Sequence, residues 1–358
     1  MLPNKNIQEL EPYLSIPHDI WKMSDCNKIL KLDWNEATIS PSPKVIEAIN
    51  NFLLSGKLNW YPNTYNIDLL DSLSQYTKQL DISYIQIFAS SDVAHENIID
   101  VFLEKGDKVC IISPTYDNFR ARANGIGVET VQFLLNDDFD LDFQRLHSFI
   151  KYYKIKFVYL CNPNNPTGIC YDVKKIEQII CENPNVMFLI DEAYYEFCKK
   201  TVAHLVKNCK NLIITRTFSK AFALASFRIG YIISHYENIN HINKLRNSKN
   251  VTMLSQVAAL AALNDLNYMN QFVDEVNKAR SMLYANLNNL DIKIYEDSKA
   301  NFVLIKTYKM KELCKYLKVN HIYIRDYDHI IPQHCRISIG TEEQMKYLVS
   351  KIKVFYEE

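Results

Sequence analysis

Glycine is scarce in this sequence, whose 358 residues include only 7 glycines. Glycine usually allows a backbone to approach a phosphate closely, so such turns can be made here with Ser or Asn instead. An excess of positive charge is also missing, because 41 Lys and Arg balance 41 Asp and Glu. No net field favours nucleic acid or an anionic membrane, and an anionic ligand must be captured locally.

Long apolar runs and metal-type cysteine spacing are missing too. No run reaches the roughly 18 apolar residues of a membrane span, and the opening MLPNKNIQELEPYL lacks the basic and apolar regions of a signal peptide. The 9 cysteines form no C-x-x-C pair, and no histidine lies at zinc spacing from them. We therefore expect a reduced, cytoplasmic, soluble protein with no metal site and no membrane or nucleic-acid partner.

What the sequence does contain is the composition of a globular enzyme, with 48% hydrophobic and 23% charged residues. A single hydrophobic core stops growing near roughly 250 to 300 residues, so the length predicts two domains. We expect an N-terminal arm at 1–40 that joins the small domain, a large ligand-binding domain at 41–245, and connecting helices with the small domain at 246–358.

Short apolar runs alternate with helical stretches through the middle of the chain, which predicts a mostly parallel sheet covered on both faces. The expected strands of this sheet are 85–88, 108–112, 128–134, 156–161, 186–190, 212–215 and 231–233. The expected helices are 43–54, 67–80, 94–103, 173–181, 237–265 and 267–290. The small domain is expected to contain strands 292–295, 302–305, 322–324 and 336–339, helix 311–317 and a terminal helix.

Polar clusters follow several of these strands, and we expect them to converge at the carboxyl edge of the sheet. They are Ser90-Ser91-Asp92, NPNNPTG at 162–168, DEAY at 191–194, and Ser219-Lys220. A desolvated lysine amine can lose its proton near neutral pH and react with an aldehyde, while Ser219 and Arg228 would hold a phosphate. Taken alone, the segment from Ser219 to Arg228 is equally compatible with a lysine and an arginine that simply lie at the surface after a strand.

Motifs along nearly the whole chain resemble the fold type I aminotransferases that use pyridoxal 5′-phosphate (PLP), within them the histidinol-phosphate aminotransferase branch. The motifs are NPNNPTG, DEAYYEF, TFSKAFALASFRIGY and CRISIGT, with Glu11-Pro-Tyr13, Asn35-Glu36, Tyr61-Pro62, Pro114-Thr-Tyr116 and Arg325-Asp326 in the same order. The resemblance implies an α/β, aspartate aminotransferase-like fold. Its large domain has a mostly parallel, mixed sheet flanked by helices, and a smaller α+β domain combines the N-terminal arm with the C-terminal third.

The resemblance also implies the cofactor site. Lys220 would bond the cofactor covalently and carry the proton, and Asp191 would pair with the pyridine nitrogen. Asn165 and Tyr194 would hydrogen-bond the phenolic oxygen, and Tyr116 would stack on the ring. The phosphate would be held by the backbone N–H groups of Ser91 and Asp92, by Ser219 and Arg228 and, in a homodimer with a composite site, by Tyr61 of the neighbouring subunit. The family usually has glycine in the turn that begins at Ser90.

For the substrate, Arg336 resembles the arginine that binds the α-carboxylate of glutamate, and Arg325 would help with a second anion. A surface salt bridge of Arg325 with Asp326 or Asp328 is the alternative. Tyr13 would cover the substrate pocket, and Asn35 belongs to the same expected site.

At one position this chain departs from its relatives, which typically read Pro-Pro-Tyr-Asn where Asn247-Ser-Lys249-Asn250 stands here. An aromatic side chain would pack an imidazole, whereas Lys249 favours a smaller, more anionic partner; a solvated Lys249 is equally compatible. We therefore predict a transaminase that uses L-glutamate and either a histidinol phosphate-type substrate or a smaller phosphorylated ketone such as dihydroxyacetone phosphate.

Two other functions compete with this interpretation. A PLP-dependent decarboxylase, like threonine-phosphate decarboxylase, would share Lys220, Asp191 and the arginines. That enzyme typically begins with a His-Gly-Gly element, and none occurs before Asn35. A regulator built on the same fold would carry a fused DNA-binding domain, but no basic extension precedes residue 40.

Overall fold

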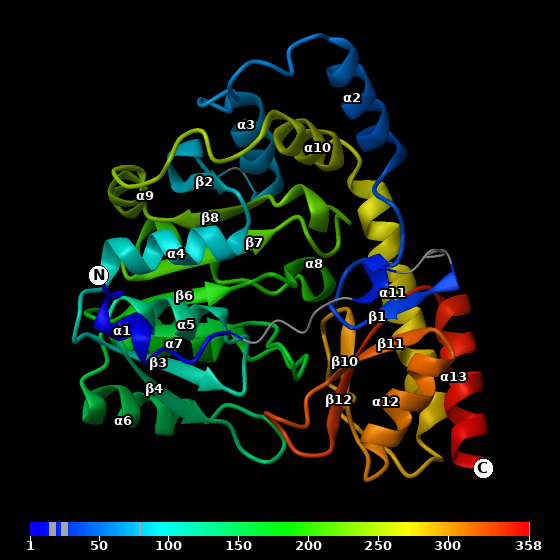
Figure 1. Ribbon diagram of the computed structural model, residues 1–358. Helices are drawn as coiled ribbons and strands as arrows, with labels where there is room; N and C mark the ends of the chain where they lie inside the picture. The colour runs from blue at the N-terminus through cyan, green and yellow to red at the C-terminus, as the bar shows by residue number, and fades with distance from the viewer. Residues whose placement is uncertain (14–18, 23–27, 79, 358) are drawn as a thin grey trace.

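The computed structural model describes residues 1–13, 19–22, 28–78 and 80–357, which fold around two sheets (Figure 1). Part of the predicted arm, 14–18 and 23–27, lies outside the described residues. The larger sheet has seven strands in the order β2-β8-β7-β6-β5-β3-β4. Their bounds are β2 (Ile85–Phe88), β3 (Lys108–Ser113), β4 (Glu129–Leu134), β5 (Phe157–Cys161), β6 (Met187–Asp191), β7 (Leu212–Thr217) and β8 (Gly230–Ser234).

Neighbouring strands of this sheet are parallel except at β8, which runs antiparallel to both β2 and β7. Consequently β2, β3, β5, β6 and β7 all end at the same edge, and the loops that follow them meet there. The mixed, mostly parallel sheet predicted from the sequence is confirmed.

Helices cover both faces of the large sheet, which is why its strands read as continuous apolar runs. One face packs against α4 (Ser91–Phe102), α5 (Asn118–Gly125) and α9 (Tyr236–Asn243). The other packs against α3 (Ile67–Tyr76), α6 (Phe143–Tyr153) and α7 (Val173–Glu182). On the first face the Phe119 ring of α5 stacks on Tyr159 of β5, with 4.7 Å between ring centroids.

The smaller sheet combines the start of the chain with its last third. Its order is β1-β11-β12-β10-β9, and β1 (Leu30–Leu32) pairs in parallel with β11 (Ile322–Asp326). The remaining strands are β9 (Lys293–Ile294), β10 (Phe302–Lys306) and β12 (His334–Ser338), and the helices after them are α12 (Met310–Val319) and α13 (Glu342–Glu357). This sheet and its helices form the predicted α+β domain. The domain boundaries predicted at residues 40 and 245 stay predictions.

Two helices join the two units; in Figure 1 the first lies above the large sheet and the second to its right. They are α10 (Met253–Leu263), which packs against α2 (Pro43–Leu54), and the 22-residue α11 (Leu266–Leu287). Within the described residues, the short helices include α1 (Lys5–Gln8), α8 (Tyr195–Cys198) and the 3-10 turns η1 (Asp19–Lys22), η3 (Ile82–Tyr84), η4 (Ala203–Lys207) and η5 (Ala225–Phe227). None of the described helices is both long and apolar enough to span a membrane.

Several predicted helix bounds were wrong, among them the end of α11, which is Leu287 rather than residue 290. The stretch 237–265 is two helices, separated by the segment 244–252. Helix α3 ends at Tyr76 rather than at residue 80. Helix α4 begins at Ser91, three residues before the predicted start, because the Ser90 side chain accepts a hydrogen bond from the Val93 amide at 3.3 Å.

Candidate active site

A cleft of about 490 Å³ lies where the carboxyl edge of the large sheet faces the arm and the small sheet. All the predicted site residues except Tyr61 and Lys249 line it. Those that do are Tyr13, Asn35, Ser91, Asp92, Tyr116, Asn165, Asp191, Tyr194, Ser219, Lys220, Arg228, Arg325 and Arg336. The structure therefore brings together residues that are far apart in the sequence.

Lys220 lies in the turn after β7, with its amine directed into the cleft. The amine donates a hydrogen bond to the Trp34 carbonyl of the arm at 3.1 Å and lies 5.8 Å from the centroid of the Tyr194 ring. Burial lowers the pKa of Lys220 to about 7, and the positive charge of Arg336 contributes to the lowering. A large fraction of this amine is therefore neutral and nucleophilic near physiological pH.

Asp191 is the last residue of β6, and its buried carboxylate is surrounded by donors. The Tyr159 hydroxyl donates to Oδ2 at 2.9 Å, and the Thr215 hydroxyl and the Ala193 amide donate to Oδ1 at 3.3 and 3.2 Å. Hydrogen bonds to both oxygens fix the orientation of the carboxylate, as required for a partner of a pyridine nitrogen.

Tyr194 and Asn165 lie beside this carboxylate in the cleft. The Tyr194 hydroxyl accepts a hydrogen bond from the Asn35 amide at 3.0 Å, and burial raises the pKa of Tyr194. Asn165 accepts a hydrogen bond from Arg336 through Oδ1 at 2.5 Å. Among the described residues its Nδ2 has no acceptor, so this amide is available to donate to a ligand oxygen.

The first turn of α4 forms an anion cradle. Gly230 permits it, since a Cβ there would lie 2.8 Å from the Ser91 amide nitrogen and 2.7 Å from the Arg216 carbonyl oxygen. Ser90 makes the turn into the helix with a φ of +98°, a conformation that favours glycine. Ser90 therefore makes the turn for which the family usually has glycine. The backbone amides in the first turn of α4 suit a phosphate.

Asp92 connects this cradle to the other side of the cleft. Its carboxylate accepts hydrogen bonds from Tyr116 at 3.1 Å and from Arg228 at 3.2 Å. The Tyr116 ring meets the Tyr13 ring edge to face, with centroids 5.7 Å apart. Ser219 faces the same region and accepts a hydrogen bond from Thr217 at 2.9 Å.

The two arginines of the small sheet differ in how they are bound. Arg336 is buried; it donates to Asn165 and Tyr327 and, at 2.6 Å, to the Asp33 carbonyl. In contrast, no hydrogen bond or ion pair engages the guanidinium of Arg325 within the described part of the chain. The alternative of a surface salt bridge is wrong for the described residues, since Asp328 pairs with Lys311 at 2.9 Å and Asp326 accepts a hydrogen bond from the Asp328 amide at 2.7 Å.

Tyr61 and Lys249 lie outside the cleft of their own chain. Tyr61 is 78% exposed, and the Lys249 amine sits over its ring. Their predicted contacts with cofactor and substrate therefore remain predictions that require a second chain.

Several lining residues were missed by the sequence analysis. Lys31 of β1 forms ion pairs with Glu36 and, at 3.1 Å, with Asp33, and its amine lies 5.0 Å from the centroid of the Trp34 ring. Burial lowers the pKa of Lys31. Tyr327 directs its hydroxyl toward Arg336 at 3.0 Å. In the sequence, these residues could have been found because they lie close to the Asn35-Glu36 and Arg325-Asp326 motifs.

The cleft fits the cofactor that the sequence resemblance implies. It combines a lysine amine that is partly neutral, a carboxylate held by donors, and an anion cradle on the first turn of a helix. An aldehyde, a ring nitrogen and a phosphate are the groups that such residues bind. Lys220, Asp191 and the α4 turn would hold these three parts of PLP.

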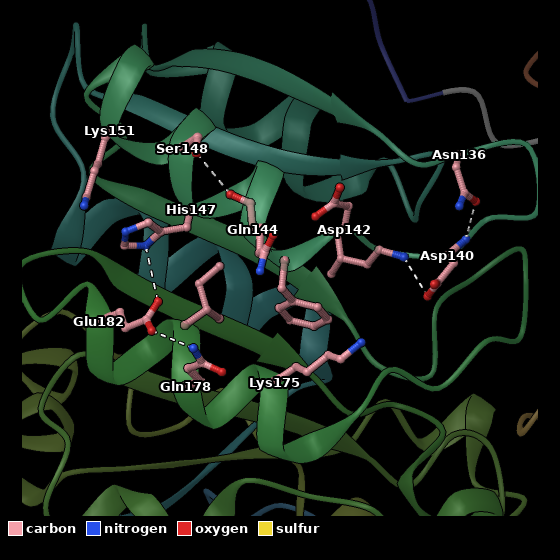
Figure 2. A pocket seen from close by; sticks show the side chains of 13 residues that line it. Asn136, Asp140, Asp142, Gln144, His147, Ser148, Lys151, Lys175, Gln178 and Glu182 are labelled. Atoms are coloured by element: carbon pink, nitrogen blue, oxygen red, sulfur yellow. Dashed lines mark hydrogen bonds and ion pairs between the residues drawn. The ribbon is translucent and has the colours of Figure 1, made fainter.

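A larger hollow of about 1010 Å³ lies elsewhere, between α6 and α7 (Figure 2). Its walls carry charges of both signs, with Lys151 and Asp142 on the side of α6 and Lys175 and Glu182 on α7. It shares no lining residue with the Lys220 cleft, and its His147 is engaged by Glu182 at 3.6 Å and by Asn183 at 3.1 Å. Its residues form no nucleophile or anion cradle, so the smaller cleft is the candidate active site.

Comparisons with known proteins identify a family model, related sequences and solved structures that are similar to this chain. Residues 27–352 match the family model described as aminotransferase class I and II. The chain is 61% identical to a dihydroxyacetone phosphate transaminase of Campylobacter jejuni, over 99% of this chain and 97% of that protein. It is 32% identical to a histidinol-phosphate aminotransferase of Ruminiclostridium cellulolyticum, over 90% and 91%. The fold matches a Sinorhizobium meliloti histidinol-phosphate aminotransferase solved with PLP, with a TM-score of 0.87, 24% identity and coverage of 98% and 97%.

Proposed function

This chain belongs to the class I and II aminotransferases, and we propose that it transfers an amino group from L-glutamate to a small phosphorylated ketone of the dihydroxyacetone phosphate type. It is a PLP-dependent transaminase. When bound, PLP supplies the aldehyde that takes up the amino group and a ring that accepts electrons from the substrate carbon.

Lys220 is proposed to bond the cofactor and, once released, to carry the proton between substrate and cofactor. Asp191 keeps the ring nitrogen protonated, and Tyr194 and Asn165 hold the phenolic oxygen. Tyr116 contacts the ring, while the backbone N–H groups of Ser91 and Asp92 and the side chains of Ser219 and Arg228 hold the phosphate. The lowered pKa of Lys220 and the free Nδ2 of Asn165 support these roles.

The observation that carries the proposed substrate is the unpaired Arg325 beside Arg336 in the cleft. A guanidinium without an internal carboxylate is available to bind an external anion, such as a phosphate, with two parallel hydrogen bonds. The 61% identical transaminase, whose name specifies dihydroxyacetone phosphate, supports a three-carbon acceptor. The glutamate donor would use the same two arginines through its carboxylates, with Asn35 and Tyr13 enclosing the cleft.

We also propose a homodimer in which Tyr61 enters the partner's cleft. The supporting observation is a cluster of exposed aromatic and aliphatic side chains on α2 and the loop after it. Its members and their exposed fractions are Leu54 at 86%, Leu58 at 58%, Trp60 at 65%, Tyr61 at 78% and Tyr65 at 79%. Apolar clusters of this kind are typical of surfaces that bind another protein.

The test is a comparison of acceptors with the purified holoenzyme. We expect amino transfer from L-glutamate to dihydroxyacetone phosphate, measured as release of 2-oxoglutarate, with a higher kcat/KM than for imidazole acetol phosphate. Arg325→Gln should lower this kcat/KM about ten- to hundredfold, because one charge-assisted contact is worth roughly 1.5 to 3 kcal/mol. Arg122→Gln is the matched control, since Arg122 pairs with Asp100 at 2.5 Å and does not line the cleft.

Two outcomes would contradict the proposal. A strong preference for imidazole acetol phosphate would show that the enzyme has the activity of a histidinol-phosphate aminotransferase instead. Release of carbon dioxide from O-phosphothreonine without amino transfer would instead establish the decarboxylase alternative.

A further inference from the structure

A buried histidine lies behind Asp191, on the helix that forms the anion cradle. His95 is 1% exposed and lies one turn after Ser91 in α4. Its Nε2 is 3.0 Å from the Thr215 hydroxyl oxygen and 3.9 Å from Oδ2 of Asp191. None of the functions described above uses His95 or Thr215.

The hydrogen bonds around Thr215 determine which nitrogen of His95 carries its proton. A threonine hydroxyl has one proton, and Thr215 donates it to Oδ1 of Asp191 at 3.3 Å. The Thr215 oxygen must then accept a hydrogen bond from His95, so neutral His95 is protonated at Nε2. The other nitrogen, Nδ1, is buried and has no partner among the described residues.

The imidazole of His95 also contacts two aromatic rings. The rings of Phe119 and Tyr159 meet the imidazole edge to face, with centroids 6.1 and 5.6 Å away. An apolar side chain would suit this environment, and a buried nitrogen without a partner costs stability. A histidine at this place is therefore expected to have a function that outweighs that cost.

We propose that His95 and Thr215 form a hydrogen-bond relay that orients the Asp191 carboxylate, so that both are positioning residues for the transamination. This inference rests on the role proposed above for Asp191. Tyr159 holds Oδ2, and the relay holds Oδ1. Without the relay, only the Ala193 amide at 3.2 Å would donate to Oδ1, and the carboxylate could rotate away from the ring nitrogen.

Polarisation gives the relay a second effect. Each donor in a chain of hydrogen bonds strengthens the next, so the His95 donor makes the Thr215 hydroxyl a better donor to the carboxylate. The relay therefore reaches the cofactor only through Asp191, while substrate affinity depends on Arg325 and Arg336. A lost relay should change kcat and the absorption of the bound cofactor and leave KM for the acceptor nearly unchanged.

The experiment compares pairs of variants in the holoenzyme. Thr215→Val removes the hydroxyl at nearly constant volume, and Thr215→Ser keeps it; His95→Leu removes the donor, and His95→Gln keeps an amide donor near the same place. We expect Thr215→Val and His95→Leu to lower kcat about tenfold and to shift the pH titration of the cofactor absorption band. Thr215→Ser and His95→Gln should keep both kcat and the absorption titration close to those of the wild type. The double variant Thr215→Val/His95→Leu should have a kcat no lower than that of either single variant.

Thr77→Val is the matched control, because it also removes a buried threonine hydroxyl, one that donates to the Leu73 carbonyl at 2.7 Å outside the cleft. The relay is overturned if Thr215→Val leaves kcat and the absorption titration like those of Thr77→Val while Asp191→Ala abolishes turnover. If Asp191→Ala itself retains turnover, the proposed role of Asp191 fails instead. Should His95→Leu not fold, the Thr215 pair decides alone.

Discussion

The Lys249 amine lies 4.3 Å from the centroid of the Tyr61 ring, and this pair projects from the surface outside the cleft of its own chain. A cation–π contact at such an exposed site is worth about 0.5 to 1 kcal/mol. In the proposed homodimer, Lys249 would reach substrate together with Tyr61, in the cleft of the second subunit.

The first prediction tests this composite site by complementation. Lys220→Ala and Tyr61→Phe each impair both sites of their own homodimers, but a mixed dimer has one site with both native groups. After subunit exchange, an equal mixture should regain about a quarter of wild-type activity, as expected for a twofold-symmetric dimer with random pairing. No regained activity despite exchange, shown by native mass spectrometry, would contradict the shared site.

The second prediction concerns acceptor specificity. Replacing Lys249 by Tyr exchanges a cation for an aromatic ring at the edge of the proposed composite site. We expect Lys249→Tyr to lower kcat/KM for dihydroxyacetone phosphate about tenfold and to raise it for imidazole acetol phosphate, measured with L-glutamate as donor. Lys351→Tyr, which replaces a cation over the exposed Tyr347 ring outside both the cleft and the proposed dimer surface, is the control. An unchanged ratio of the two acceptors would show that Lys249 is merely solvated.

The third prediction follows from the pKa of Lys220, which burial and Arg336 lower to about 7. The neutral amine is the reactive form, and its fraction rises as the pH increases through this pKa. The rate at which the apoenzyme captures PLP should therefore rise with pH up to about 8 and then level off. Arg336→Met should move the midpoint to higher pH. Borohydride trapping should label Lys220, and label on another lysine would disprove the assignment.

The fourth prediction concerns Glu196, a buried residue of α8 whose Oε2 has no partner among the described residues. Burial raises the pKa of Glu196 to about 7, although Arg216 opposes this effect. Between roughly pH 4.3 and this value, the unfolded chain has lost a proton that the folded protein keeps, so stability falls as the pH rises.

Glu196→Gln should abolish that part of the pH dependence, because glutamine does not ionise and can still accept the hydrogen bond from Tyr76. The gain in the free energy of unfolding at about pH 8 should exceed the gain at about pH 5 by up to about 3 kcal/mol. Urea denaturation of the apoprotein at both pH values measures the difference. Equal gains at the two values would mean that the carboxyl does not titrate in this range.

The fifth prediction concerns Ser90, whose φ of +98° is unfavourable for a residue with a side chain. Strain of this kind costs about 1 to 3 kcal/mol, whereas changing a serine cap to glycine costs only a few tenths. Ser90→Gly should therefore raise the free energy of unfolding by about 1 kcal/mol after the extra backbone entropy of glycine, roughly 0.5 to 1 kcal/mol, is subtracted. Ser90→Ala, which keeps the strain and loses the cap, should lower it.

The fold class and most of the cleft were predictable because their signals are local. Apolar runs separated by helical spacing predicted the large sheet, and the carboxyl ends of its strands predicted where Lys220 and Asp191 meet. The order of the motifs predicted the family, which the comparisons confirm. Helix bounds were less predictable, since the start of α4 depends on the capping contact of a single side chain, Ser90.

The tertiary structure alone decided which groups are engaged and which are free. Arg325 and Arg336 read alike in the sequence, but one is buried among protein acceptors and the other faces the cleft without a partner. Similarly, nothing in the local pattern of α4 or β7 links His95 with Thr215, because 120 residues separate the two atoms that meet. Periodicity records which face of an element is buried, whereas the partners on that face exist only once the chain has folded.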